Sequence, residues 1–491
     1  MSSASCADNR PRRSIRRKTG SPMIVMKFGG TSVGGAEAIR QVAEIVAKYR
    51  DHDLVVVLSA MSKVTDALRA MAAQACEGTE PTDSLSALRK RHDETIRAVA
   101  EGEERKRALG VCTGLIDELS GILHGITLLR ELSPRSIDLV SSFGERLSVV
   151  VVSAALRSAG LSSLPVDARE YVKTNERYTE AEVNYAETER RLSAGLAPMV
   201  SEGCIPVVTG FIGSTDEGVT TTLGRGASDF TASLVASALQ AEEVWIWTDV
   251  DGAMTADPRI VEDARVLKEI SYLEASEMSY FGAKVLHPMT MLPAVKQEIP
   301  IRIRNTFRTG NSGTLITSRT RAAPLGVKAV TSIDRLCLIM VEGTSLSRTP
   351  DTHARLFKTT ADRKTQVVMI TQASSEHDIC LVVGEGDSPG TVQALKEEFR
   401  HEVAEGSLEE ISVQPDLAVV AVVGGGMKGT PGIAARTFGI LGEHGINIIA
   451  IAQGSSELNI SFIVGRDDLR KTVQLVHASF GLGGDGDFAY D

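Results

Sequence analysis

The sequence predicts an α/β protein that is built on a mainly parallel sheet and followed by two smaller α/β units. Three observations support this fold class. Strand and helix patterns alternate from residue 23 to about 310, glycine-rich turns follow several of the predicted strands, and an internal repeat appears beyond residue 320. The chain has 491 residues, which is too long for one ordinary domain, so we expect two or three.

The first predicted elements form a βαβ unit. Apolar runs at 23–30 and 53–62 read as strands, and an amphipathic helix is predicted between them at 36–50. Such a crossover helix makes the two strands parallel. A polar helical region follows at 64–135. Two buried strands are predicted at 203–214 and 242–250, with a helix between them at 227–240.

The composition changes near residues 320–326, and a repeat follows. "ITQASSEHDICLVV" aligns with "IAQGSSELNISFIV", so that Gln372 matches Gln453. Each copy is predicted to form a βαββ-like unit. We therefore expect an extension, a catalytic domain and a repeated region, at residues 1–22, 23–320 and 321–491, with repeat units at about 331–400 and 415–480.

The composition argues against several classes of partner and compartment. A net charge of −10 argues against nucleic acid as a partner. The sequence contains no run of 18 apolar residues, so a membrane-spanning helix is not expected. The six cysteines show neither CxxC spacing nor histidines at ligand spacing, which is typical of reduced thiols in a cytoplasmic protein. The arginine-rich residues 1–22 lack the apolar segment of a secretory signal. We expect them to form a disordered extension rather than a transit segment or a nucleic-acid arm.

The stretch "VMKFGGTSVGG" combines a lysine with bare backbone at the end of a predicted strand. Glycine amides at Gly29 and Gly30 can approach an anion closely, and Lys27 adds a positive charge, so the turn suits a phosphate group. It is not a Walker A loop, because the lysine precedes the glycines. A glycine turn beside a surface lysine explains this motif equally well when it is taken alone.

Four further stretches shift that balance. "TTTLGRGASDF" places Arg225 between two glycines, where a guanidinium can clamp a carboxylate or phosphate. Its Ser228 and Asp229 suit the cap region of the following helix. Thr248 and Asp249 lie at a predicted strand end, where open α/β sheets bind ligands, and Lys284 lies among apolar neighbours. Glu145 is placed just inside a helix, where a glutamate usually complements the helix dipole.

Together these stretches supply glycine loops, cations and carboxylates, without a Ser–His–Asp or Cys–His set. This combination favours phosphoryl transfer, which depends on positioning and charge neutralisation. In their order and spacing the motifs resemble those of the aspartate kinases of the amino acid kinase superfamily, over roughly residues 23–470. The motifs that carry the resemblance are "KFGGTSV", "LSAMSKVTD", "SFGERLS", "GFIGS", "TTLGRGASD", "TDVDGAMTADPR" and "FGAKVLHP".

The resemblance implies an amino acid kinase fold followed by two ACT domains, which are ferredoxin-like βαββαβ modules that bind amino acids. It implies ATP-dependent phosphorylation of the side-chain carboxylate of L-aspartate to 4-phospho-L-aspartate, the first step toward lysine, threonine, methionine and isoleucine. Since that carboxylate has a pKa of about 3.9, it is already ionised at neutral pH and needs no general base.

The resemblance also implies roles for residues in the phosphoryl-transfer step. Lys27 would neutralise charge on the phosphoryl group, and the amides of Gly29 and Gly30 would cradle it. Asp229 would orient the lysines around the reacting groups. These four residues are the expected catalytic set.

Substrate and nucleotide contacts follow from the same motifs. Arg225 would bind the α-carboxylate of aspartate and Glu145 its α-ammonium, while Thr65 and Ser228 would help to hold its carboxylates. Mg²⁺ would accompany the nucleotide, held largely by phosphates and water, and no protein metal site is expected. The residues expected to face ATP are Lys27, Gly30, Thr248, Asp249, Arg259 and Lys284.

Two positions depart from the family pattern. Met254 stands where some relatives have a tyrosine, so a stacking or hydroxyl contact to the nucleotide is in doubt there. Ala227 replaces a glycine that is common in this loop. The "QxSSE" strand ends resemble those of threonine-sensitive members, which implies that threonine rather than lysine binds near Gln372 and Gln453. Pairing of ACT domains implies a homodimer or a larger homo-oligomer.

Three alternatives compete with this interpretation. The spacing of Gly424, Gly426 and Gly429 fits a dinucleotide site, but the next strand ends in Gln453 rather than in an acid for the ribose, so a turn in an ACT domain is favoured. A non-catalytic amino-acid sensor is disfavoured by the presence of Lys27, Arg225 and Asp229 together. A kinase for another acid, such as glutamate or carbamate, is disfavoured because such relatives normally lack the tandem C-terminal modules.

Overall fold

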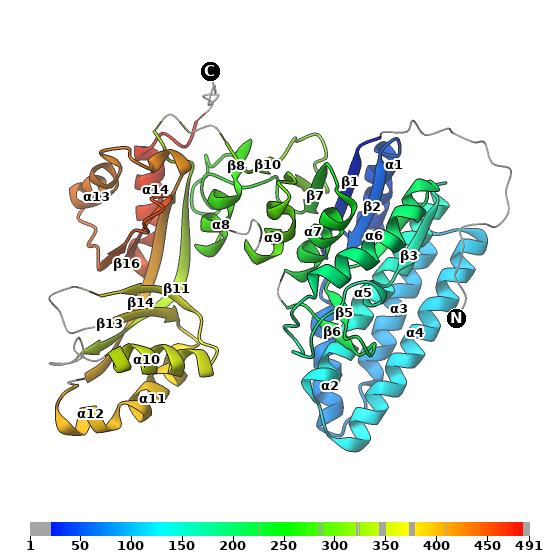
Figure 1. The fold of residues 1–491 in the computed structure, drawn as a ribbon, viewed down its shortest axis with the longest axis horizontal. Coiled ribbons are helices and arrows are strands. Elements are labelled where there is room, and N and C mark those ends of the chain that lie inside the picture. The colour runs from blue at the N-terminus through cyan, green and yellow to red at the C-terminus, as the bar shows by residue number, and fades with distance from the viewer. Residues whose placement is uncertain are drawn as a thin grey trace. The chain divides into compact units, whose positions relative to one another are not determined.

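The computed structural model describes residues 21–224, 226–283, 286, 288–320, 323, 325–342, 350–372, 379–408 and 410–484. Contacts between residues divide the chain into two compact units (Figure 1). The first contains Met1–Ala253, Lys268–Tyr272 and Leu286–Arg319. The second contains Met254–Leu267, Leu273–Val285 and Thr320–Asp491. A break near residue 320 was expected, whereas the assignment of 254–267 and 273–285 to the second unit was not.

The first unit is organised around an eight-stranded sheet in the order β3-β4-β2-β1-β7-β9-β10-β8. Neighbouring strands from β3 to β9 are parallel, β10 is antiparallel to β9, and β8 is parallel to β10, which confirms the mainly parallel sheet. In chain order its strands are β1 (Met23–Phe28), β2 (Asp53–Leu58), β3 (Ser163–Val166), β4 (Ile205–Thr209), β7 (Glu243–Thr248), β8 (Glu269–Ser271), β9 (Ile301–Asn305) and β10 (Thr314–Thr317).

One predicted strand is divided into two. The segment 203–214 forms β4 and then, beyond a turn at Phe211 with a φ of +68°, the short β5 (Ile212–Ser214). β5 pairs with β6 (Thr220–Thr222) in a separate two-stranded sheet. The apolar pattern continues across the turn because both strands are buried, so the sequence alone did not reveal the break.

The helices of the first unit agree with the predicted periodicity. α1 (Ala36–Lys48) connects β1 to β2, and α7 (Ala227–Leu239) precedes β7, as expected. The polar region 64–135 is confirmed as helical, and α3, α4 and α5 lie side by side (Figure 1). The remaining helices are α2 (Val64–Cys76), α3 (Thr82–Val99), α4 (Gly102–Leu129), α5 (Pro134–Ser158), α6 (Tyr185–Ser201) and α9 (Pro288–Lys296).

Two of these helices, α4 and α5, are long and apolar enough to cross a membrane by length and composition alone, which is weak evidence for a span. In α5, 89% of the apolar window is buried inside the protein. In α4 the buried residues Cys112, Ile116, Leu119 and Leu123 recur at helical spacing and join the same hydrophobic core as α5. α5 therefore packs against the sheet, and α4 packs against α5 with its buried face.

Alternation along β1 directs its side chains to opposite faces of the sheet. Ile24, Met26 and Phe28 belong to the core that also contains residues of α1 and α5. Lys27, between Met26 and Phe28, therefore points to the other face, where α7 packs against β1 and β7. The strand pattern itself thus places the lysine beside the start of α7.

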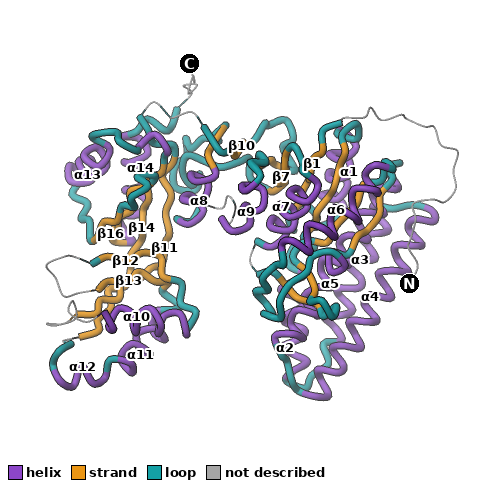
Figure 2. Tube along the Cα trace, viewed as in Figure 1, coloured by secondary structure: helices purple, strands orange, loops and turns teal. Residues whose placement is uncertain are grey.

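The second unit contains the predicted repeat as a six-stranded sheet in the order β12-β13-β11-β14-β16-β15. Each repeat has the order strand, helix, strand, strand, helix, and α10 with α11 and α13 with α14 form two separate pairs beside the strands (Figure 2). Its main elements are β11 (Ala329–Glu342), α10 (Pro350–Asp362), β12 (Val367–Thr371), β13 (Ile379–Gly384), α11 (Ser388–Glu398), α12 (Arg400–Glu405), β14 (Glu410–Val423), α13 (Ile433–Glu443), β15 (Ala450–Ala452), β16 (Asn459–Gly465) and α14 (Leu469–Ser479).

The two repeats share their central strands. β11 and β14 are antiparallel neighbours along almost their whole length. Val330 at the start of β11 packs in the core of the second repeat, while Ile411 at the start of β14 packs in the core of the first. Each hydrophobic core therefore includes a residue from the other repeat's first strand, so the two ACT-like modules form one folded body.

The glycine motif at Gly424, Gly426 and Gly429 lies in this unit, where β14 leads through a short 3₁₀ turn to α13. A Cβ atom on Gly424 would lie 2.1 Å from the carbonyl oxygen of Gly326. The glycine is needed because two backbone segments approach closely there. This packing accounts for Gly424, and the place of the motif in a turn of the repeat agrees with the preferred interpretation of the sequence.

Candidate active site

A pocket of about 790 Å³ lies in the first unit, where the parallel strands β1, β2, β4 and β7 end. Ligands of open α/β sheets bind at this edge, because the loops that leave neighbouring strands diverge there. The pocket is lined by Lys27, Gly29, Gly30, Thr31, Ser59, Ala60, Met61, Ser62, Lys63, Thr65, Asp66, Arg69, Glu145, Thr179, Glu180, Phe211, Gly224, Gly226, Ala227, Ser228, Asp229 and Thr248.

Lys27 and Asp229 form an ion pair in this pocket, with Nζ 2.6 Å from Oδ1. Lys27 is on β1, and Asp229 is in the first turn of α7. The lysine side chain is 11% exposed and the aspartate 18%, so the pair is largely shielded from water. Neither Ser228 nor Asp229 caps the helix with its side chain, and Gly226 occupies the N-cap position. The carboxylate is directed to the lysine instead.

Glu145 presents a second buried carboxylate to the pocket. Its residue is 3% exposed, and its Oε1 accepts a hydrogen bond from the amide of Ala60 at 3.1 Å. The other oxygen, Oε2, is buried without a hydrogen-bond partner among the residues that the structure describes. Burial raises the pKa of Glu145 from 4.5 to about 8, against the opposing effect of the hydrogen bond from Ala60. An ammonium group in the pocket would supply the missing partner.

The position of Glu145 in its helix differs from the one expected. It lies near the middle of α5, which begins at Pro134, so it is not a first-turn partner of the helix dipole. Gly144 beside it allows α5 to pack closely on the turn after β2, because a Cβ atom there would lie 2.7 Å from the Cβ of Ala60. This close packing brings the carboxylate to the Ala60 amide.

The glycine turn after β1 is built by backbone hydrogen bonds to neighbouring strands. The amide of Gly29 donates to the carbonyl oxygen of Trp247 at 3.1 Å, and the carbonyl of Gly30 accepts from the amide of Ser62 at 3.1 Å. The amide of Gly29 is thus engaged with β7. The cradling of a phosphoryl group by the amides of Gly29 and Gly30 stays a prediction, and the approach to an anion is more direct for Gly30.

Three more expected residues line the pocket. Thr65 is in the first turn of α2, Ser228 is at the start of α7, and Thr248 is the last residue of β7. Asp249 is not a lining residue, and its Oδ1 accepts a hydrogen bond from the Thr248 hydroxyl at 3.2 Å. Arg225 lies outside the described residues, although Gly224 and Gly226 on either side of it line the pocket.

The remaining expected residues belong to the second unit. Arg259 is 79% exposed and pairs with Asp257 at 2.6 Å, and Lys284 lies outside the described residues. Gln372 and Gln453 are exposed and directly follow β12 and β15, so the repeat places them at equivalent strand ends. The Oε1 of Gln372 is 3.3 Å from Nε2 of His353 on α10.

Several lining residues were not identified from the sequence. Lys63, Thr179 and Phe211 all have left-handed backbone conformations, with φ of +65°, +73° and +68°. Such conformations are uncommon outside glycine and gather at functional sites. Lys63 and Phe211 lie in motifs that carried the resemblance, whereas nothing in the sequence around Thr179 and Glu180 indicated a pocket wall.

The charges of the pocket suit an anionic and zwitterionic ligand. Lys27, Lys63 and Arg69 supply positive charge, and four lining residues supply carboxylates: Asp66, Glu145, Glu180 and Asp229. Among the residues that the structure describes, no group of three or more His, Cys, Asp or Glu side chains could hold a metal ion. The pocket can therefore position and neutralise a phosphate-bearing ligand, and a divalent ion would be bound mainly by that ligand.

Comparisons with known proteins agree with this site. The amino acid kinase family model matches residues 22–305, and the ACT domain model matches residues 339–399 and 420–480. Bifunctional aspartokinase/homoserine dehydrogenase 1 of Arabidopsis thaliana is 38% identical over 473 residues, which are 94% of this chain and 51% of that protein. The chain thus spans about half the length of this relative.

Solved structures match over nearly the whole chain. Escherichia coli aspartokinase III in complex with aspartate and ADP is 32% identical, with a TM-score of 0.78, and the match covers 93% of this chain and 99% of that one. The same protein in complex with lysine and aspartate has the same identity and TM-score, covering 94% and 99%. With both the kinase and the ACT matches in place, the chain belongs to the amino acid kinase family, among the aspartokinases that carry ACT domains.

Proposed function

We propose that the protein transfers the γ-phosphoryl group of ATP to the side-chain carboxylate of L-aspartate, which yields 4-phospho-L-aspartate. The observation that carries this proposal is that one pocket contains both the Lys27–Asp229 pair and the Glu145 carboxylate, whose Oε2 has no hydrogen-bond partner among the described residues. The first group fits a transferring phosphoryl group and the second fits an α-ammonium. A related protein was solved with aspartate and ADP, which supports the same pair of ligands here.

In this proposal Lys27 neutralises the charge that develops on the phosphoryl group, and Asp229 fixes the position of the Lys27 ammonium. The amide of Gly30 donates to a phosphoryl oxygen. Catalysis is then mostly electrostatic, because the aspartate carboxylate is already ionised at neutral pH and needs only to be held in line. No covalent enzyme intermediate is required.

Recognition of L-aspartate follows from groups on three segments. Glu145 binds the α-ammonium through Oε2, and Arg225 binds the α-carboxylate. Thr65 and Ser228 hold the carboxylates by hydroxyl hydrogen bonds. Gly224 and Gly226, which flank Arg225 in the sequence, line the same pocket as Glu145, which supports this assignment.

ATP is proposed to meet Lys27, Gly30, Thr248, Asp249, Arg259 and Lys284. Mg²⁺ would be held largely by the phosphates and water, which fits a pocket where Lys27 already engages the Asp229 carboxylate. Met254 stands where some relatives present a tyrosine, so no stacking or hydroxyl contact to the nucleotide is proposed there.

We further propose that an amino acid regulates the enzyme through its ACT domains, and that threonine is the effector rather than lysine. Gln372 and Gln453 would contact it from the equivalent ends of β12 and β15. The QxSSE pattern supports threonine, while the lysine complex of the Escherichia coli relative makes lysine the alternative. Pairing of the ACT domains would give a homodimer or a larger homo-oligomer.

A cytoplasmic location is proposed as well. Free thiols at Cys76, Cys112 and Cys337 support a reducing compartment. The names of several plant relatives place those proteins in chloroplasts, so fractionation of the native host would distinguish the two compartments.

The proposed activity is tested by ADP release from Mg-ATP with a panel of acceptors: L-aspartate, L-glutamate, D-aspartate and carbamate. Turnover with L-aspartate alone is expected. Turnover with another acid would replace the substrate, and a folded protein that binds amino acids without any turnover would support the sensor alternative.

A further inference from the structure

We propose that Asp138 is a positioning residue that fixes the Thr179–Glu180 wall of the pocket, and so sets the affinity for L-aspartate. The inference rests on the proposed function for its choice of substrate. Asp138 is on α5, two helical turns before Glu145, and the residue is fully buried. It does not line the pocket itself, so it would act through the segments that it holds.

Three hydrogen bonds converge on this carboxylate from two segments of the pocket. Oδ2 accepts from the amide of Thr179 at 2.9 Å and from the amide of Thr222 at 2.9 Å. Oδ1 accepts from the hydroxyl of Thr222 at 2.7 Å. Thr179 is a lining residue, and Thr222 ends β6, directly before the glycine loop that contains Gly224 and Gly226. One side chain thereby joins both segments to the helix that carries Glu145.

The wall that Asp138 holds is strained. Thr179 has a φ of +73°, a left-handed conformation that is costly for a β-branched residue. Such a conformation persists only where neighbouring groups determine it. The amide of Thr179 donates its hydrogen bond to Asp138, a neighbouring group of this kind. Strain at a lining residue together with a buried group that maintains it points to a functional position.

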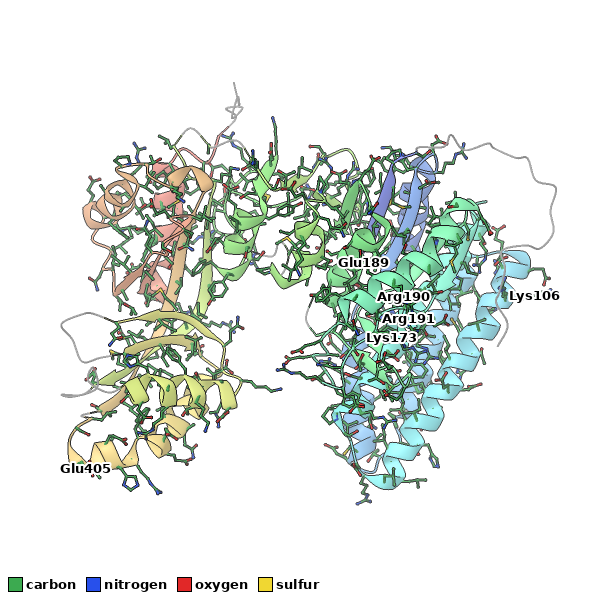
Figure 3. The ribbon with its side chains drawn as sticks, in the orientation of Figure 1. Lys106, Lys173, Glu189, Arg190, Arg191 and Glu405 are labelled. Atoms are coloured by element: carbon green, nitrogen blue, oxygen red, sulfur yellow. The ribbon has the colours of Figure 1, made fainter. Side chains whose placement is uncertain are left out.

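The other end of this segment is anchored independently. Lys173, labelled in Figure 3, is 5% exposed, and its Nζ donates to the hydroxyl of Ser214 on β5 at 2.8 Å. The amide of Asn184 donates to the carbonyl of Lys173 at 2.8 Å, which closes the base of the loop. At the pocket end, the amide of Ala181 donates to the carbonyl of Thr222 at 2.9 Å. The tip is therefore held by Asp138 together with this backbone hydrogen bond, whereas the base is held by Lys173 without Asp138.

Burying a carboxylate in a protein core costs free energy unless hydrogen bonds or an ion pair compensate it. Burial raises the pKa of Asp138, and its hydrogen bonds from Thr222 and Thr179 oppose that effect. No ion pair with Asp138 is found in the part of the chain that the structure describes. Its three hydrogen bonds connect α5 to the Thr179 segment and to the end of β6.

The test compares Asp138→Asn with Ser153→Ala, a matched control that removes another buried polar group from α5. The Ser153 hydroxyl has no hydrogen-bond partner among the described residues, so its loss should leave the pocket unchanged. An asparagine keeps the shape but has one acceptor oxygen, so it cannot accept all three hydrogen bonds. We expect the KM for L-aspartate to rise about tenfold in Asp138→Asn, with smaller changes in kcat and in the KM for ATP.

Two further variants separate positioning from folding. Thr222→Val removes only the hydroxyl hydrogen bond and should give a weaker form of the same KM effect. Thr179→Gly relieves the strained backbone, since glycine adopts this conformation without cost. If Asp138 acts by maintaining Thr179, the tenfold effect of Asp138→Asn should shrink in the Thr179→Gly background.

Hydrogen exchange supplies a readout that does not depend on the substrate. The amides of Thr179 and Thr222 should exchange faster in Asp138→Asn than in the wild type or in Ser153→Ala. Unchanged exchange, or a uniform change of both KM values, kcat and Tm, would overturn the proposal. If the wild type lacks aspartate-dependent turnover, the proposed function fails, and faster exchange confined to the two amides still supports the positioning role.

Discussion

Lys27 Nζ and Asp229 Oδ1 lie 2.6 Å apart, and they join the end of β1 to the start of α7 inside the pocket. The side-chain alternation of β1 and the approach of α7 to β1 and β7 produce this contact. The aspartate holds the lysine in one position before any ligand binds. Preorganised charge of this kind stabilises a transition state without reorganisation during the reaction.

Lys27→Ala is expected to lower kcat by about 10²–10³, the typical effect of removing one preorganised electrostatic contact from a transition state. The KM for L-aspartate should change much less, because the lysine acts on the phosphoryl group. Steady-state kinetics measures both constants. Lys106→Ala, which removes a lysine on α4 that is 75% exposed, is the matched control (Figure 3). Equal losses in the two variants would contradict the role of Lys27.

The buried carboxylate of Glu145 predicts a pH-dependent affinity for L-aspartate. With a pKa of about 8, Glu145 is protonated in the free enzyme at pH 6–7, and an ammonium must displace that proton. The KM for L-aspartate should therefore fall as the pH rises from 6 to 8, by up to about tenfold per pH unit. Calorimetry in buffers of different ionisation enthalpy should detect up to one proton released per aspartate bound.

Glu145→Gln removes the titrating group and should abolish this pH dependence. The KM should also rise about tenfold to hundredfold, because a neutral amide replaces a charged partner of the ammonium. Glu189→Gln, an exposed change on α6, is the control (Figure 3). A pH profile of KM that persists in Glu145→Gln would assign the titration to another group.

Gly29 and Gly30 differ in the space around them, although both lie in the same turn. A Cβ atom on Gly29 would have ordinary contacts of 3.7 Å, whereas one on Gly30 would lie 3.1 Å from the carbonyl oxygen of Ala60. Gly30→Ala should therefore shift the turn whose amide holds Glu145 and lower kcat/KM by at least about tenfold. Gly29→Ala should retain most of the activity. The reverse order in parallel kinetics would contradict the assigned geometry.

Regulation can be tested at the two equivalent glutamines. Threonine is expected to inhibit the wild type, and Gln372→Ala together with Gln453→Ala should weaken this inhibition about tenfold without loss of basal activity. Inhibition curves with threonine and with lysine, at fixed substrate concentrations, measure the effect. Flat threonine curves combined with inhibition by lysine would reassign the effector.

Much of the fold could be predicted because the patterns are local. The alternating apolar residues of β1, the crossover helix α1 and the repeated strand ends of the second unit are all visible in short windows of sequence. The break between β4 and β5 was missed because both strands are buried across Phe211. The shared cores of the two repeats were also missed, because strand pairing between β11 and β14 depends on residues far apart in the chain.

The site was predictable where a motif combined charge with glycine. Lys27, Ser228 and Asp229 were found in this way and meet in the pocket, whereas Thr65, which also lines it, followed from the family resemblance alone. The engaged amide of Gly29 depends on a contact with Trp247, which no local pattern contains. Thr179 and Asp138 were missed for the same reason, since they are 41 residues apart and meet only in the folded chain.

The most direct test of the central claim is to trap the product with hydroxylamine while the enzyme turns over Mg-ATP and L-aspartate. An acyl phosphate on the side chain would be captured as aspartyl hydroxamate. We expect hydroxamate in proportion to ADP for the wild type and for Lys106→Ala, and a loss of both products in Lys27→Ala. ADP release without hydroxamate, or hydroxamate that is undiminished in Lys27→Ala, would contradict the account.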